Sequence, residues 1–379
     1  MSVRNIARCT RCVLPTALPS VKMDQNGVCN YCLEYERLFG NWTQIQERRK
    51  KEFEELVGKA KRLKRRYDCL IPLSGGKDST YALYICSKVY GLKCLCITFD
   101  NGFLSQYAKE NIDNAIKATN ADHIFYTVDR NVLLRLYRLF LLKCGNFCPV
   151  CMRGIDLSMH MASQYFKIPI VVGGDARRIA YLGFIPELFE GGGWYFFNRV
   201  VENDEFQKDA APLLMNPYGS NLRKIAHLTC SLLRIPTPMV GKHIGIFDYI
   251  DISLDEVCNI LKKEMGWASP TEEIEHMDCV LHEIPFYIHT LKFPELTTTT
   301  CYHSGLIRLG IMTRERALDI EILGLTNRRT PKVLDSFLRE IEISREEFEV
   351  SVRDWRKMDK FRNRKRRVIA SLYHSIARD

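Results

Sequence analysis

A short polar turn in the first third of the chain carries residue types that bind phosphate. It follows the apolar run YDCLIPL (67–73) and reads SGGKDS. Two glycines permit a sharp turn and close approach of the backbone to a ligand, and a helix beginning there points free N–H groups toward it. A lysine adds a mobile cation. The turn therefore predicts an oxyanion site, although it differs from the G-x-x-x-x-G-K-S/T loop. Its residues are Ser74, Gly75, Gly76, Lys77, Asp78 and Ser79.

Four cysteines near the N-terminus have the spacing of a metal site. Cys9-x2-Cys12 is followed by Cys29-x2-Cys32. Two such knuckles form a tetrahedral all-thiolate site, which closes on one Zn²⁺ at about 2.3 Å. With four protein ligands the ion has no open position, so we expect it to be structural. An iron site and chance spacing are the alternatives.

A second group of cysteines lies in mid-chain, where residues 144–151 read CGNFCPVC. Clustered thiols of this kind have four interpretations. They are buried structural cysteines, a second zinc site, a redox or persulfide pair, or ligands of an iron–sulfur cluster. The spacing alone leaves all four open.

Alternating strand and helix patterns predict the scaffold that positions these groups. Four apolar strands, each followed or preceded by an amphipathic helix, indicate a doubly wound parallel α/β sheet. Ligands of such sheets lie at the carboxyl ends of the strands. The strands are expected at 67–73, 93–100, 123–128 and 168–174. The accompanying helices are expected at 42–66, 78–91, 105–120, 131–143 and 152–166, with mostly helical sequence over 313–379.

Composition indicates a protein without membrane spans or a secretion signal, and we expect it to be cytoplasmic. Fifteen cysteines without such a signal favour metal sites or reactive thiols over disulfides. The net charge of +10 is concentrated in residues 47–66 and 353–367, which are either phosphate-binding segments or solvated helices. The predicted domains are a zinc ribbon (1–40), a charged linker helix (41–66), the α/β domain (67–270) and a helical substrate region (271–379).

The turn SGGKDS after the first strand resembles the signature of the PP-loop ATP pyrophosphatases. The resemblance implies an enzyme that binds ATP and Mg²⁺, transfers AMP to a carbonyl oxygen, holds pyrophosphate in the loop, and lets a nucleophile displace AMP. It assigns catalysis to Lys77, Asp78 and Asp175. It assigns nucleotide binding to the loop and to the ends of the second and fourth strands, at Asp100, Asn101, Gly173 and Gly174. Asp100 and Asp175 have strand-end capping as their alternative.

Over residues 8–325 the chain resembles the N-acetyl sugar amidotransferases, which make acetamidino groups on bacterial surface sugars. The matching stretches are the ribbon, YDCLIPLSGGKDS, DNGF, MDCVLHEI (277–284) and GLIRLGIMTRERAL (305–318). The resemblance implies glutaminase and ammonia-channel subunits as partners and a sugar nucleotide as substrate. It carries over Lys242 and Arg308 as phosphate contacts.

The mid-chain Cys-x2-Cys departs from that family and instead resembles the tRNA-thiolating PP-loop enzymes. In those, three cysteines hold a [4Fe-4S] cluster with one open iron. The ligands here would be Cys148, Cys151 and Cys279, with Cys144, Cys230 and Cys301 as weaker choices. Two reactions follow: amidation of an acetamido sugar, or thiolation of tRNA or a small molecule. A ribbon-type binding module with a degenerate ATP fold is the non-enzymatic alternative. His276, His282, His289 and His303 are candidate proton acceptors.

Overall fold

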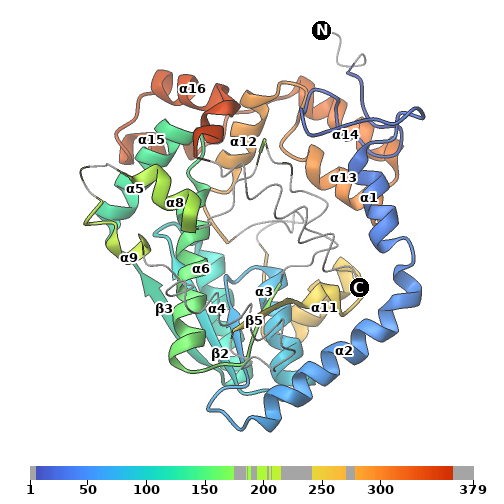
Figure 1. The fold of residues 1–379 in the computed structure, drawn as a ribbon, viewed down its shortest axis with the longest axis vertical. Coiled ribbons are helices and arrows are strands. Elements are labelled where there is room, and N and C mark those ends of the chain that lie inside the picture. The colour runs from blue at the N-terminus through green and yellow to red at the C-terminus, as the bar shows by residue number, and fades with distance from the viewer. Residues whose placement is uncertain are drawn as a thin grey trace, which may run out of the picture.

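The computed structural model describes residues 6–174, 185, 187–188, 194–202, 205, 207–214, 241–269 and 278–361. A five-stranded parallel sheet lies at its centre, in the order β3-β2-β1-β4-β5 (Figure 1). The predicted doubly wound α/β fold is confirmed. The strands are β1 (Cys69–Pro72), β2 (Cys94–Asp100), β3 (Asp122–Thr127), β4 (Ile170–Gly173) and β5 (Lys242–Gly245).

The strand order places the glycine turn at the point where the winding of the sheet reverses. From β1 the chain proceeds to β2 and β3 on one side, and then crosses to β4 on the other side of β1. A crevice forms at such a switch point, outside the carboxyl ends of the strands. The turn after β1 opens into this crevice. β5 was not expected from the sequence, and it pairs with β4 from Ile170↔Lys242 to Gly173↔Gly245.

Helices cover both faces of the sheet. One face carries α3 (Lys77–Tyr84), α4 (Gln106–Thr119) and α11 (Leu254–Met265), which pack on one another. The other face carries α6 (Cys148–Tyr165), which contacts β1, β2 and β4. α3 passes into a π-helical turn (Ile85–Val89) where a continuous α-helix was expected. Because apolar side chains of the central strands meet helices on both sides, the sheet is buried and its polar chemistry is confined to the strand ends.

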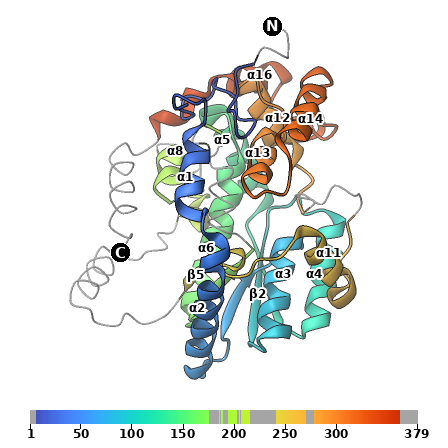
Figure 2. The same cartoon turned by 90° about the vertical axis from the view of Figure 1, so that its right-hand side faces the viewer.

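The charged helix predicted over 42–66 is observed as α2 (Trp42–Arg62). One stripe of it, containing Phe53, Leu56, Val57 and Ala60, is buried in the core shared with α3, α4 and α11. Its charged residues face solvent and pair at helical spacing, as Lys51 does with Glu47. α2 is therefore packed onto the α/β body along the side of the molecule (Figures 1 and 2).

The C-terminal region is helical, as predicted, and lies over the end of the sheet at which the crevice opens (Figures 1 and 2). It shares an aromatic-rich core with α5 (Arg130–Cys144) and the start of α6. Phe103, Tyr137, Phe147 and Phe337 contact one another in this core. The region comprises α12 (Glu283–Lys292), α13 (Thr300–Arg308), α14 (Arg314–Thr326), α15 (Leu334–Glu340) and α16 (Arg345–Arg353). The part of the chain that the structure describes also contains the short helices α1 (Asn30–Phe39), α8 (Trp194–Val201) and α9 (Ala211–Leu214) and the 3-10 turns Ile246–Asp248 and Trp355–Lys360.

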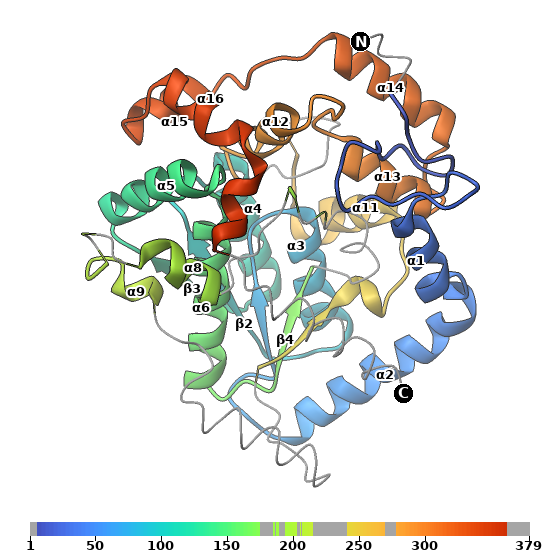
Figure 3. The same ribbon diagram turned by 45° about the horizontal axis from the view of Figure 1, so that its top comes forward.

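The N-terminal cysteine segment packs beside α13 and α14, far from it in sequence (Figure 3). Arg314 donates from Nε and Nη2 to the backbone oxygen of Cys9 at 3.1 and 2.9 Å. Beneath it, buried Glu321 accepts from His303 Nδ1 at 2.9 Å and from the hydroxyl of Thr297 at 3.0 Å. The segment is too small for its own apolar core and takes its support from these helices. The domain limits themselves remain a prediction. Within the described ranges, no helix is long and apolar enough to cross a membrane.

Candidate active site

The Ser74–Ser79 turn is braced by its own hydroxyl groups. Ser79 Oγ accepts from the Ser74 backbone N–H at 3.1 Å and donates to the Gly76 carbonyl at 3.1 Å. Thr80 Oγ1 donates to the same carbonyl at 2.8 Å. The Lys77 side chain is almost fully buried, and its ammonium lies 3.2 Å from Asp78 Oδ2. The turn thus presents a preformed backbone with one cation at the start of α3.

Gly75 is the residue that only glycine can occupy without strain. Its φ is +80°, and a Cβ atom there would lie 2.8 Å from the Ala108 Cα and still closer to the Ala108 carbonyl oxygen. Its carbonyl accepts from Trp267 Nε1 at 3.0 Å and from Asn111 Nδ2 at 3.2 Å. The turn therefore packs tightly against α4 and is held by hydrogen bonds from Trp267 and Asn111. These contacts fix its conformation without a ligand.

The predicted glycine motif at the end of β4 meets the turn. A Cβ atom at Gly174 would lie 2.7 Å from the Asp78 Cβ, so the strand end and the first turn of α3 are in contact. Gly173 is the last residue of β4. Both residues stand where the resemblance predicts nucleotide-binding residues, although binding itself stays a prediction. Asp175 lies outside the described residues.

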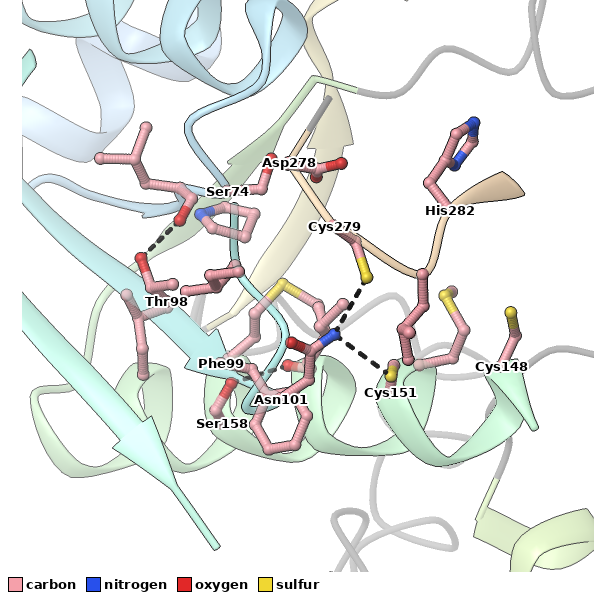
Figure 4. Close-up of a pocket in the computed structure, with 18 of the residues that line it drawn as sticks. Ser74, Thr98, Phe99, Asn101, Cys148, Cys151, Ser158, Asp278, Cys279 and His282 are labelled. Atoms are coloured by element: carbon pink, nitrogen blue, oxygen red, sulfur yellow. Dashed lines mark hydrogen bonds between the residues drawn. The ribbon is translucent and has the colours of Figure 1, made fainter. Parts of the chain in front are cut away.

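A cavity of about 270 Å³ lies beside the turn. Its walls come from the ends of β1 and β2, the first turns of α6, and the segment 278–285 (Figure 4). Ser74, Asn101, Asp278 and His282 supply polar groups, whereas the rest of the wall is mainly apolar and sulfur-containing. A largely apolar cavity with a few convergent polar groups is the usual form of a small-molecule site.

The three cysteines predicted as cluster ligands line this one cavity (Figure 4). Cys148 and Cys151 occupy the first turn of α6, which begins at residue 148 and not at 152 as expected. Cys279 arrives from a distant segment that pairs with the chain following β2. Val280 N–H donates to the Phe103 carbonyl at 2.9 Å, and Ser105 N–H donates to the Asp278 carbonyl at 3.0 Å. The structure therefore brings together three thiols that are far apart in sequence.

Burial controls the protonation of these thiols. It raises the pKa of Cys148 and Cys151 above the usual thiol value and that of Cys279 to about 12. A protonated thiol is a poor nucleophile, whereas a bound metal deprotonates the thiols that coordinate it. Without a bound metal, these thiols are therefore expected to be protonated at neutral pH.

The mid-chain trio does not have the geometry of a second single-ion zinc site. Among the described residues, only the N-terminal quartet brings three or more His, Cys, Asp or Glu ligand atoms within 4.8 Å of one another. A cluster of four irons spaces its thiolates more widely than a single ion does. Cys148, Cys151 and Cys279 supply three thiols around one cavity, the donor type that an iron–sulfur cluster takes, and a [4Fe-4S] cluster held by three thiolates would retain one iron without a protein ligand.

The N-terminal quartet has the predicted form of a closed metal site. The Sγ atoms of Cys9, Cys12, Cys29 and Cys32 all lie within 4.8 Å of one another, and all four residues are buried. Hydrogen bonds from Cys29 and Cys32 lower the pKa of Cys12 to about 7. Four clustered thiols of this kind fit a structural Zn²⁺.

The structure places two predicted phosphate contacts away from the turn. Arg308 Nη1 lies 3.7 Å from Cys12 Sγ and 3.9 Å from Cys32 Sγ, where its charge offsets that of the quartet. Lys242 is the exposed first residue of β5 and pairs with Ile170, at the amino edge of the parallel sheet. The turn lies at the carboxyl edge, so Lys242 is at the opposite edge of the sheet and Arg308 is beside the quartet, and the contact of either residue with phosphate stays a prediction.

Asp100 is the last residue of β2 and Asn101 follows it, but the two side chains make different contacts. Asp100 Oδ1 accepts from the Gly102 N–H at 2.8 Å, so it caps the turn after the strand. Asn101 instead directs its amide toward Cys151 and Cys279 (Figure 4). Asn101 also lines the cavity beside the turn, and its contact with nucleotide stays a prediction.

Among the histidines, His282 alone of the described candidates lines the cavity. His289 and His303 are buried elsewhere, and His276 lies outside the described residues.

Sequence reasoning missed Asp278, whose carboxylate would lie 3.9 Å from a Cβ atom at Gly76 and which therefore faces the turn. Its position directly before Cys279 was the signal that could have drawn attention to it.

Fold and site together define a doubly wound α/β protein with an anion-type turn, a thiol-lined cavity beside it, and a four-cysteine site. Residues 282–374 match the family model described as "LPS biosynthesis protein WbpG-like, C-terminal domain". That match begins at the cavity-lining His282 and covers the C-terminal part of the chain.

Two further proteins are similar to this chain. An uncharacterized protein of Methanocaldococcus jannaschii is 32% identical over 131 residues, which are 34% of this chain and 43% of that protein. The chain thus spans less than half the length of this curated relative. The U34-tRNA thiolase NcsA from Methanococcus maripaludis, solved with its [4Fe-4S] cluster, aligns with 86% of this chain and 90% of its own at 17% identity, with a TM-score of 0.34.

Proposed function

We propose that the chain is an ATP-dependent enzyme of the PP-loop class, which adenylates a carbonyl oxygen and releases AMP and pyrophosphate. The observation that carries this proposal is the braced Ser74–Ser79 turn, which stands at the switch point of a parallel sheet and beside a cavity. Lys77 and the backbone N–H groups at the start of α3 would hold the departing diphosphate. Asp78 and Asp175 would hold Mg²⁺ through carboxylate oxygens.

The acceptor that the family match supports is a sugar of bacterial surface polysaccharide. An acetamido oxygen is a poor leaving group, and transfer of AMP makes it a good one. Ammonia then attacks the activated carbon, AMP departs with the former carbonyl oxygen, and an acetamidino group remains. His282, at the cavity wall, would take the proton that the attacking nitrogen loses. The apolar wall, which includes Phe99 and Leu281, would keep water from the adenylated intermediate.

Sulfur transfer is the second candidate reaction, and the three cysteines at the cavity favour it. With a cluster bound, the site would supply an iron that can carry sulfide. Thiolation would then replace the activated oxygen with sulfur on a small molecule or on tRNA. Both reactions use the same adenylation step and differ only in the nucleophile.

One experiment tests adenylation and separates the two reactions. The anaerobically purified protein is incubated with ATP, Mg²⁺ and a panel of N-acetyl sugar nucleotides, with either an ammonium salt or sulfide. Amidation predicts AMP and pyrophosphate with ammonium, and a sugar product whose mass shows exchange of oxygen for NH. Thiolation predicts turnover with sulfide and a sulfur-containing product. Formation of ADP and phosphate would reject the PP-loop assignment.

A further inference from the structure

Two side chains that hold no place in the proposed adenylation step make hydrogen bonds to the sulfurs of the cavity. Asn101 Nδ2 donates to Cys151 Sγ at 3.5 Å and to Cys279 Sγ at 3.6 Å (Figure 4). The Tyr137 hydroxyl lies 3.2 Å from Cys151 Sγ. Asn101 thus links Cys151, which lies on α6, to Cys279, which lies 178 residues further along the chain than Asn101.

The orientation of the Asn101 amide is fixed by its surroundings. Asn101 Oδ1 accepts from the Phe103 backbone N–H at 2.8 Å, so the NH₂ group must point to the sulfurs. The Tyr137 hydroxyl carries one proton, which can be accepted either by the Asn101 backbone carbonyl at 3.2 Å or by a Cys151 thiolate at 3.2 Å, and the Tyr137 ring is fully buried in the aromatic core. Both donors are therefore held in place without any contribution from a ligand.

We propose that Asn101 and Tyr137 are positioning residues for the three-cysteine site, which hold Cys151 and Cys279 at the separation a metal cluster requires and tune the charge on their sulfurs. This inference rests on the cluster-bearing form of the proposed function. Bare thiols in a packing role need no donors, whereas thiolates carry negative charge that an N–H or O–H group stabilises. Such outer partners orient metal ligands and set reduction potentials through hydrogen bonds to sulfur.

Asn101 and Tyr137 are hydrogen-bonded to different sets of sulfurs, so substitution of each should change the cluster site in a different way. Asn101 contacts two ligands on different segments, so its loss should loosen Cys279 relative to α6. Tyr137 lies within hydrogen-bond distance of Cys151 Sγ, so its loss should alter the charge at that sulfur and leave the spacing largely intact. We therefore expect a larger effect on cluster retention from Asn101 and a measurable effect on cluster potential from both.

The test uses the full-length protein, reconstituted anaerobically with ferrous iron and sulfide as probes. Asn101→Asp keeps the oxygen that accepts from Phe103 but removes the donor, and Tyr137→Phe removes only the hydroxyl. Ser158→Ala is the matched control, because Ser158 lines the same cavity and its hydroxyl donates to the Ile155 carbonyl and not to a thiol. The readouts are iron per chain, the rate of iron loss to a chelator, and the reduction potential. Zinc content at the quartet reports folding in every variant.

We expect Asn101→Asp to hold iron about 10- to 100-fold more weakly than the wild type. Tyr137→Phe should shift the potential, and Ser158→Ala should behave as the wild type, with zinc unchanged in all. Iron retention and potential equal to wild type in both substituted proteins would overturn the inference. A wild-type protein that releases AMP and pyrophosphate but takes up no iron would also overturn it, while leaving adenylation intact. If the wild type forms no AMP and pyrophosphate, but iron retention and reduction potential change in the variants as expected, the proposed reaction is rejected and the positioning role stands.

Discussion

Replacement of Gly75 by alanine tests whether the turn is a preformed and tightly packed element. Gly75 combines a φ of +80° with a close approach to the backbone of Ala108. An added Cβ would meet Ala108 Cα at 2.8 Å and the carbonyl carbon at 2.9 Å, and these backbone atoms cannot rotate away as a side chain would. The turn or α4 must therefore move.

Two contributions determine how much Gly75→Ala lowers the free energy of unfolding. The left-handed conformation costs a residue with a Cβ about 1–2 kcal/mol. Overpacking against a fixed neighbour adds about 1–3 kcal/mol. We therefore expect Gly75→Ala to lower the free energy of unfolding by about 2–5 kcal/mol, which is a large share of the 5–15 kcal/mol typical of a domain.

Gly91→Ala is the matched control for this substitution. Gly91 also has a positive φ, of +59°, but the nearest atom to an added Cβ is the tip of the Lys61 side chain at 4.0 Å. It should show only the conformational term, about 1–2 kcal/mol. Urea denaturation of both variants and of the wild type measures the difference. Equal destabilisation by the two substitutions would refute the close packing of the turn against α4.

Three further predictions concern other parts of the molecule. Lys77→Ala should abolish AMP and pyrophosphate formation while far-ultraviolet circular dichroism stays unchanged, because the substitution removes charge at the turn; wild-type turnover in this variant would disprove the role of Lys77. Cys9→Ser should lose zinc and solubility together, since metal binding is coupled to folding in small ribbons; a soluble, zinc-free protein of normal stability would contradict the structural role of the ion. Burial, reinforced by Lys292, lowers the pKa of His289 from 6.5 to about 3. The unfolded chain therefore binds more protons than the folded one between those values, and stability should fall by up to about 5 kcal/mol as the pH drops through that window. Urea midpoints of His289→Gln should fall less over the same pH range; an unchanged pH dependence would rule out His289 as the responsible group.

The sheet and the metal quartet were predictable because each follows from a local pattern. Buried strands are apolar runs next to glycine turns, and the quartet is two Cys-x2-Cys knuckles. β5 was missed because Lys242–Gly245 has only four residues, of which the first two are exposed. The start of α6 was placed four residues too late, because Cys148-Pro149 read as loop although proline is well tolerated in a first helical turn.

Only the parts of the site that lie on one contiguous segment were predictable from the sequence. The turn at 74–79 is contiguous, whereas the thiol-lined cavity depends on pairing between the chain after β2 and the segment at 278–280. Resemblance pointed to Cys279, but no spacing rule could show that Asn101 faces it. Arg308 was carried over as a phosphate contact from the family resemblance, whereas the structure places its guanidinium beside Cys12 and Cys32 of the quartet. Packing between distant segments determines which groups Asn101 and Arg308 contact, and a single sequence carries no direct information about that packing.

The most direct test of the account is a structure of the protein with Mg²⁺ and an ATP analogue that cannot be cleaved between the α and β phosphates. The account predicts that the β and γ phosphates lie over the Ser74–Ser79 turn, within reach of Lys77, with the α phosphate directed toward the cavity lined by Asn101 and Cys279. A nucleotide bound elsewhere, or no bound nucleotide at saturating concentration, would contradict it.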